Sequence, residues 1–237
     1  MALKCRDKAK VNDFEINLIT QSASGLDLSP MEIQRKRLDI KLNYDDDFAE
    51  IDAIICKRLN KQNDKGIVLL HGLPGTGKTT YLRYLIGKLK KRVMFLPPSL
   101  AASITNPDFL NILVEHPNSV LIIEDAENII TDRNESQNSV VSNLLNLSDG
   151  LLADCLSAQI ICTFNMPLTN VDDALLRKGR LIAKYEFKKL SLEKSQRLSK
   201  HLGFETYISE PMSVSEIYNQ HEKNFVKEKK KVGFAGN

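Results

Sequence analysis

The stretch GIVLLHGLPGTGKTTYLRYLIGKLKKR, residues 66–92, decides the fold of this chain. Residues 66–72 are a short apolar run ending in glycine, which predicts a buried strand. Residues 78–92 carry apolar side chains at helical spacing and end in basic residues, which suit the C-terminal end of a helix dipole. A glycine-rich loop joins the two segments, so the order is strand, loop, helix.

The loop, GLPGTGKT at residues 72–79, matches the pattern G-x-x-x-x-G-K-[ST]. Glycines let backbone N–H groups surround a phosphate without side-chain clashes, and the following helix adds its positive N-terminal dipole. We expect Lys78 to reach the β- and γ-phosphates of a nucleotide and Thr79 to coordinate Mg²⁺ through its hydroxyl. The predicted nucleotide-binding residues are Gly72, Leu73, Pro74, Gly75, Thr76, Gly77, Lys78, Thr79 and Thr80.

Further apolar runs alternate with helical patterns, which is typical of βαβ units and a parallel sheet. The additional strands are expected at 92–96, 119–124, 159–164 and 183–187. Helices are expected from Asn106 and Pro107 through His116, and over about 137–148. The sequence therefore predicts an α/β fold with a parallel five-stranded sheet flanked by helices, over residues 44–190.

Beyond residue 190 the pattern is only helical, which predicts a small C-terminal lid with a basic tail over residues 191–237. Ser191 is expected to cap a helix to about Leu202, and Ser213 with Glu216 forms a capping box for a last helix. Residues 1–43 are assigned to an N-terminal segment, interpreted as the remnant of a larger region. Within it, RLDIKLNY at 37–44 alternates like an edge strand.

Composition places the chain among folded globular proteins, with 27% charged and 42% hydrophobic residues. The net charge of +3 creates no strong field, so nucleic acid is not an expected partner, and the lysines at 227–231 are interpreted as a solvated helix end. The four cysteines form no C-x-x-C pair, which favours reduced thiols. No apolar run approaches the ~18 residues of a membrane span, so we expect no membrane association and a cytoplasmic location.

Two carboxylates end the apolar run SVLIIED at residues 119–125. An acidic pair at the end of a strand beside a phosphate loop can hold a hydrated Mg²⁺ and polarise the attacking water. We assign Glu124 to the metal and Asp125 to the base, with the reverse assignment left open. The competing interpretation is a strand that ends in solvated acids.

Asn165 follows the strand at 159–164, where its amide could bond both the water and the γ-phosphate, although asparagine also ends strands as a turn former. The segment DDALLRKGR at 172–180 then brings Arg177 and Arg180 close to a glycine. A guanidinium matches a phosphate in charge and shape, so these arginines could stabilise the transition state in a neighbouring subunit's site. The alternative is a surface turn with solvated arginines.

Together these segments resemble the AAA ATPase family, with residues 72–79 as its Walker A motif and 119–125 as its Walker B motif. TFN at 163–165 resembles sensor 1, and 172–180 the arginine-bearing second region of homology. The resemblance covers about residues 44–231. Within the family, the Glu124–Asp125 order and residues 142–152 are similar to the branch containing the mitochondrial translocase of the Rieske iron–sulfur protein.

The resemblance implies Mg²⁺-dependent ATP hydrolysis in a homo-oligomeric ring, hexameric in this family, acting on a protein substrate. It implies that Arg177 is a finger acting in trans with Arg180 as its companion, and that Asn165 is sensor 1. It also implies that Phe48 or its neighbours lie near the adenine.

Three functions remain open. The leading hypothesis is an ATPase that couples turnover to remodelling or moving a protein partner. The second is a nucleotide-gated binding scaffold with negligible hydrolysis. The third is a P-loop kinase or a DNA-associated loader, which the lack of aromatic residues interleaved with the basic tail argues against.

Overall fold

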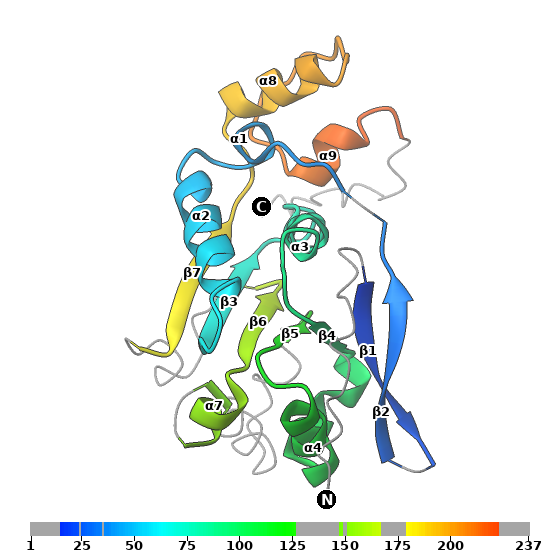
Figure 1. The fold of residues 1–237 in the computed structure, drawn as a ribbon. Coiled ribbons are helices and arrows are strands. Elements are labelled where there is room, and N and C mark those ends of the chain that lie inside the picture. The colour runs from blue at the N-terminus through cyan, green and yellow to red at the C-terminus, as the bar shows by residue number, and fades with distance from the viewer. Residues whose placement is uncertain are drawn as a thin grey trace, which may run out of the picture.

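The computed structural model describes residues 15–23, 25–34, 36–126, 147–148, 151–166 and 179–222. Its centre is a seven-stranded sheet in the order β2-β1-β4-β5-β6-β3-β7 (Figure 1). Neighbouring strands are parallel, except for the antiparallel β1–β2 pair. The strands are β1 Glu15–Ser22, β2 Gly25–Glu32, β3 Gly66–Gly72, β4 Val93–Leu96, β5 Val120–Ile123, β6 Gln159–Phe164 and β7 Leu181–Phe187.

Helices cover both faces of the sheet. On one face lie α2 (Phe48–Leu59) and α3 (Lys78–Ile86), preceded by the short α1 (Ile40–Asn43). On the other lie η1 (Pro98–Thr105), α4 (Pro107–Glu115) and α7 (Leu151–Leu156). The lid helices α8 (Leu192–His201) and α9 (Val214–Tyr218) lie beyond the end of the sheet, next to α1 (Figure 1). The predicted α/β sheet and helical lid are both present.

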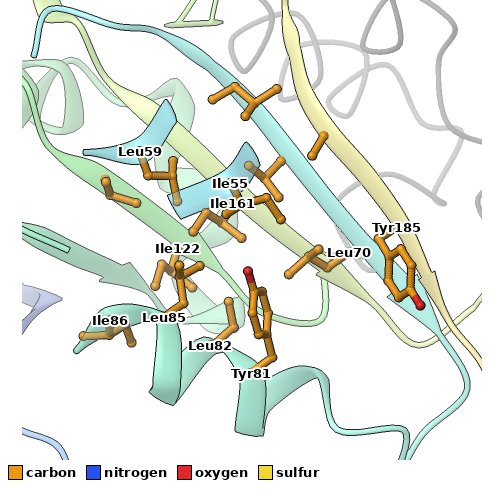
Figure 2. Close-up of a cluster of buried hydrophobic side chains, with 14 of the residues drawn as sticks. Ile55, Leu59, Leu70, Tyr81, Leu82, Leu85, Ile86, Ile122, Ile161 and Tyr185 are labelled. Atoms are coloured by element: carbon orange, nitrogen blue, oxygen red, sulfur yellow. The ribbon is translucent and has the colours of Figure 1, made fainter. Parts of the chain in front are cut away.

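The central strand β3 is buried along its whole length because both of its faces are covered. Ile67 and Leu69 point into the core on the α4 side, whereas Val68 and Leu70 point into the core on the α3 side. Figure 2 shows the second core, where Tyr81, Leu82, Leu85 and Ile86 of α3 face the sheet. Burying each such side chain contributes roughly 1.5–3 kcal/mol, so these helical positions hold α3, and the loop before it, against the sheet.

All five predicted strands are present, but the sheet is larger than predicted. The hairpin β1–β2 adds two strands, and β1 pairs in parallel with β4 through Asn17↔Met94 and Leu18↔Phe95. Residues 15–32 are therefore continuous with the sheet of the α/β core.

The predicted edge strand at 37–44 was wrong. Asp39 accepts a hydrogen bond from the backbone N–H of Leu42 and caps α1, so this segment contains a helical turn. Its apolar alternation arises because Ile40 packs into the α3-side core while Leu42 packs against the lid. One segment thus contacts two different apolar clusters.

The predicted helix starts and caps agree with the structure, whereas two predicted ends do not. Ser191 caps α8, and Ser213 and Glu216 form the reciprocal capping box of α9. The helix expected over 78–92 ends at Ile86, where Gly87 is its C-cap. α9 ends at Tyr218 instead of running on toward the lysines, which lie outside the described residues. Of the helix expected at about 137–148, only 147–148 are described, and they are helical.

Candidate nucleotide-binding site

Three neighbouring parallel strands end at the same edge of the sheet, and each is followed by predicted site residues. β3 leads into the loop at 73–77, β5 into Glu124 and Asp125, and β6 into Asn165. The carboxyl ends of parallel strands are where open α/β sheets bind ligands. Segments about 90 residues apart in the chain are therefore brought into one place.

The phosphate loop depends on a glycine at position 77. Its φ of 94° is left-handed, and a Cβ there would lie 3.0 Å from Cε1 of the Tyr44 ring. The Tyr44 hydroxyl also donates a 2.9 Å hydrogen bond to the Gly77 carbonyl. The loop is thus held from below by a buried aromatic residue that precedes α2.

Lys78 lies under the loop, with its side chain almost fully buried. Its Nζ donates hydrogen bonds of 2.8 Å to the carbonyls of Gly72 and Leu73. The Thr76 hydroxyl donates to the same Leu73 carbonyl at 2.7 Å. The amine is therefore already positioned on the inner side of the loop, where a phosphate would lie.

The two predicted metal ligands are in direct contact. The Thr79 hydroxyl donates a 2.8 Å hydrogen bond to Glu124 Oε1. Mg²⁺ in nucleotide sites prefers one or two protein oxygen ligands, completed by phosphate oxygens and water. A hydroxyl beside a carboxylate at the end of the phosphate loop fits this ligand set, and it supports the assignment of Glu124 to the metal.

Asp125 and Asn165 form the second pair. Asn165 Nδ2 donates a 2.6 Å hydrogen bond to Asp125 Oδ1, while Asp125 Oδ2 accepts no hydrogen bond from the described residues. Asp125 has a left-handed backbone with φ of 51°, and its N–H donates to the Thr163 hydroxyl at 3.1 Å. The predicted base and the predicted sensor are therefore brought together.

A pocket of about 410 Å³ opens between the phosphate loop and the lid, within the usual range for small-molecule sites. Asn165 and residues of the loop and of α3 line one side: Gly75, Gly77, Lys78, Thr79 and Thr80. Residues of the lid and of the segment before α2 line the other: Lys36, Asn43, Val214, Ser215, Tyr218 and Asn219. The pocket is large enough to take a nucleotide with its phosphates on the loop side.

Hydrogen bonds join the lid to the rest of the pocket. The Ser215 N–H donates to the Gly75 carbonyl at 2.9 Å, and the Tyr218 hydroxyl donates to Asn43 Oδ1 at 2.8 Å. In the capping box of α9, burial raises the pKa of the Glu216 carboxyl, but the hydrogen bonds with Ser213 and the nearby Lys189 ammonium together outweigh burial and leave that pKa lowered. The lid is thus positioned directly over the loop.

Phe48 does not line this pocket, and the expected place of the adenine near Phe48 or its neighbours stays a prediction. Its side chain is fully buried, and the centroid of its ring lies 4.9 Å from that of Tyr44 and 4.5 Å from that of Tyr185. The ring belongs to an aromatic cluster under α2 because it contributes more apolar burial there than at a polar pocket. Asn43, at the end of α1, lines the pocket.

Of the two predicted arginines, Arg180 is described, and it is not among the residues that line this pocket. Arg180 lies just before β7, where its carbonyl accepts the Ile67 N–H at 2.8 Å, at the end of β3 opposite to the loop. Arg177 lies outside the described residues. Next to the loop, burial lowers the pKa of His71, so this residue favours the neutral form.

Sequence reasoning missed Asn43, Tyr218 and Thr163 as site residues. Thr163 carried a usable signal, since it is the one hydroxyl in the otherwise apolar stretch IICTF of a fully buried strand. Asn43 and Tyr218 match no local pattern, because their role depends on a contact between segments 175 residues apart.

Among the described residues, no group of three or more His, Cys, Asp and Glu side chains is arranged to hold a metal ion alone. A magnesium ion here would share its coordination with a nucleotide. In the same parts of the chain, no helix has the length and hydrophobicity needed to cross a membrane.

Comparison with known proteins gives several matches. An AAA-ATPase of Arabidopsis thaliana is 34% identical over 139 residues, 53% of this chain and 27% of that protein. A second AAA-ATPase of the same plant is 28% identical over 174 residues, 64% and 36% of the two chains. The probable mitochondrial chaperone bcs1 of Schizosaccharomyces pombe is 35% identical over 124 residues, 49% and 27%. The matches thus span about a third of the length of these relatives.

The family model for the "ATPase family associated with various cellular activities (AAA)" matches residues 68–189, about half of the chain. The matched region contains the phosphate loop, the acidic pair and Asn165. The predicted resemblance is confirmed, and the match to a mitochondrial chaperone agrees with the predicted branch. On its fold, its site and this match, the chain belongs to the AAA family of ATPases.

Proposed function

We propose that this chain binds ATP with Mg²⁺ in the pocket under the lid and hydrolyses it in a ring of like subunits, hexameric as is common in the family. Turnover is coupled to remodelling or moving a protein partner. The observation that carries this proposal is the pairing of Thr79 with Glu124 and of Asn165 with Asp125 at the end of the phosphate loop. One pair supplies metal ligands and the other supplies a base.

The loop side of the pocket binds the phosphates. Lys78 Nζ, now bonded to two loop carbonyls, exchanges these neutral acceptors for phosphate oxygens, with which its hydrogen bonds are charge-assisted and stronger. Thr79 and Glu124 would hold Mg²⁺, which would supply positive charge to offset the negative charge of the phosphates.

The base acts on the water that attacks the terminal phosphorus. Asp125 Oδ2 accepts a proton from that water while Asn165 holds Oδ1, so the carboxylate keeps one orientation. The bond from phosphorus to the bridging oxygen of ADP breaks as the new bond to the water oxygen forms. The products are ADP and inorganic phosphate, and the proton passes from Asp125 to solvent.

An arginine from a neighbouring subunit completes the site. Arg180 begins β7 at the end of the sheet away from its own pocket, which supports delivery of Arg177, with Arg180 as its companion, to the next subunit. A guanidinium delivered in trans stabilises charge on the transferring group and accelerates phosphoryl transfer by about 10³–10⁵ in known cases. Activity therefore depends on assembly.

Mixed assemblies test this proposal. Arg177→Ala chains have an intact site but lack the arginine, and Asp125→Asn chains have the arginine but lack the base. Each is expected to be nearly inactive alone, and an equimolar mixture is expected to regain part of the wild-type rate at mixed interfaces. Arg197→Ala removes an exposed lid arginine and serves as the matched control, with wild-type activity expected. A dilute monomer with full activity would contradict the ring.

The alternative is a nucleotide-gated scaffold whose hydrolysis is negligible. It is favoured by the short Asp125 side chain, one of whose oxygens already accepts a hydrogen bond from Asn165. In that case ATP binds tightly, turnover does not increase with assembly, and Asp125→Asn leaves the slow rate unchanged. The same measurements therefore decide between the two functions.

A further inference from the structure

Asp125 has a backbone conformation that residues with side chains rarely adopt. Its φ of 51° is left-handed, a conformation that costs most residues roughly 1–2 kcal/mol and that aspartate and asparagine adopt more readily than others. Asn63, Asn118 and Ser157 share this conformation, but Asp125 is the one that lies at the nucleotide site. Strain of this kind persists where surrounding contacts hold it in place.

Two hydrogen bonds to one residue hold this turn. The Asp125 N–H donates to the Thr163 hydroxyl at 3.1 Å, and the next N–H, that of Ala126, donates to the Thr163 carbonyl at 2.8 Å. Thr163 is 2% exposed, on the strand between β5 and β3. Two successive peptide groups after β5 are therefore fixed by a single buried residue.

The hydroxyl of Thr163 has a specific partner. A buried hydroxyl is unfavourable unless it is hydrogen-bonded, and valine would fill the same volume in this apolar strand without that requirement. The interaction that the hydroxyl makes with the Asp125 backbone is thus what distinguishes threonine from valine at this position.

The backbone at Asp125 decides where its carboxylate lies. An aspartate has only one methylene group between Cα and the carboxylate, so the direction of the Cα–Cβ bond restricts the carboxylate to the few positions that its staggered rotamers allow. In the observed turn, Oδ1 meets Asn165 Nδ2 at 2.6 Å. If the backbone left this left-handed conformation, the Cα–Cβ bond would point in another direction. The aspartate side chain is too short to bring its carboxylate back to Asn165.

We propose that Thr163 is a positioning residue, which holds Asp125 in its left-handed turn and so directs the carboxylate to the reacting water. This inference rests on the proposed role of Asp125 as the base in ATP hydrolysis. Thr163 does not line the nucleotide pocket. Because Thr163 acts through Asp125, the expected effect is on the chemical step rather than on nucleotide binding.

The test compares Thr163→Val, which removes the hydroxyl and keeps the shape, with Thr163→Ser, which keeps the hydroxyl. With the full chain, we expect Thr163→Val to lower kcat by about 10- to 100-fold, because small misplacements of a catalytic group have effects of this size. KM for ATP is expected to change less than about twofold. Thr163→Ser is expected to retain kcat within about threefold.

Ile161→Val is the matched packing control, since it trims another buried side chain of β6. It is expected to reduce thermal stability without changing kcat. If Ile161→Val lowers kcat as much as Thr163→Val does, or if Thr163→Ser is as slow as Thr163→Val, the effect is general to strand packing and the proposal is overturned.

A double-mutant cycle separates this inference from the proposed function. In the Asp125→Asn background, Thr163→Val is expected to have no further effect on the residual rate, because the group that it positions is gone. If Asp125→Asn does not slow turnover at all, the assignment of the base fails. If Asp125→Asn abolishes turnover but Thr163→Val leaves kcat unchanged, only the positioning role fails.

Discussion

The hydroxyl of Thr79 lies 2.8 Å from Glu124 Oε1, so the first carboxylate after β5 faces the start of α3. The second carboxylate, Asp125, faces Asn165 at the end of the neighbouring strand. Two adjacent acids thus have different partners, and different substitutions should separate their roles.

Glu124→Gln is expected to raise the Mg²⁺ concentration needed for half-maximal ATP hydrolysis by about tenfold or more, because an amide is a weaker ligand than a carboxylate. Asp125→Asn is expected to leave this Mg²⁺ dependence unchanged and to lower kcat by about 10²–10⁴, the usual contribution of a general base. Magnesium titrations of the steady-state rate measure both effects. The opposite result, with Asp125→Asn shifting the Mg²⁺ dependence, would mean that the two acids exchange roles.

Gly77→Ala is expected to abolish tight ATP binding and to reduce the free energy of unfolding by roughly 1–3 kcal/mol. The left-handed φ of 94° becomes strained, and the new methyl group meets the Tyr44 ring. Gly203→Ala is the matched control, since its φ of 83° is also left-handed but a Cβ there has open space. We expect this control to lose stability through strain alone and to bind ATP normally. Calorimetric titration and urea unfolding of both variants would show whether Tyr44 matters.

Tyr218→Phe removes the hydrogen bond from the lid to Asn43. Because one such bond contributes about 0.5–1.5 kcal/mol, we expect the Kd for ATP to rise about two- to tenfold, with kcat unchanged. Tyr207→Phe, at a residue that is 84% exposed, is the control. An unchanged Kd in Tyr218→Phe would show that lid closure does not depend on this contact.

The buried amine of Lys91 is expected to make the stability of the fold depend on pH. Its Nζ donates to Gln159 Oε1 at 2.8 Å in a site that is only 3% exposed, and burial lowers its pKa to about 8. In the unfolded chain, the Lys91 amine keeps its proton up to its ordinary pKa of about 10.5. Between pH 8 and this value, the unfolded state therefore binds more protons than the folded state. Lys91 is therefore expected to add roughly 1–3 kcal/mol to the free energy of unfolding between pH 8 and pH 10. This contribution opposes the loss expected from Cys56 and Cys162, because burial raises the pKa values of their thiols.

Urea unfolding at several pH values tests this dependence. The slope of the free energy of unfolding against pH should be lower in Lys91→Met than in the wild type, whereas Lys90→Met, which changes the exposed neighbouring lysine, should keep the wild-type slope. An equal slope in the wild type and in Lys91→Met would assign the pH dependence to other groups.

The phosphate loop and its two flanking elements could be predicted because their information is local. Within residues 66–86, the glycines, the lysine and the apolar spacing each determine the conformation of residues close to them in the chain. The structure has the strand, loop and helix where expected. The acidic pair and Asn165 were predictable for a related reason. Parallel strands that end in polar residues bring those residues to a common edge.

The hairpin β1–β2 was missed because its burial depends on distant partners. Asn17 occupies a buried position in β1, where its amide donates to the Val93 carbonyl and accepts from Arg92. A buried asparagine breaks the apolar alternation that would indicate a strand. The pocket wall formed by Asn43 and Tyr218 could not be predicted for the same reason. The two residues are far apart in the chain, and no pattern in the sequence around either one indicates their contact.

The place of β3 in the sheet has a consequence for how the chain is synthesised. β3 lies between β6 and β7, so it gains its second neighbour only after the ribosome has reached Phe187. At about 5–20 residues per second, the apolar strand before the phosphate loop emerges several seconds earlier than its partners. Until those partners are made, the apolar strand that carries the nucleotide site needs protection from aggregation.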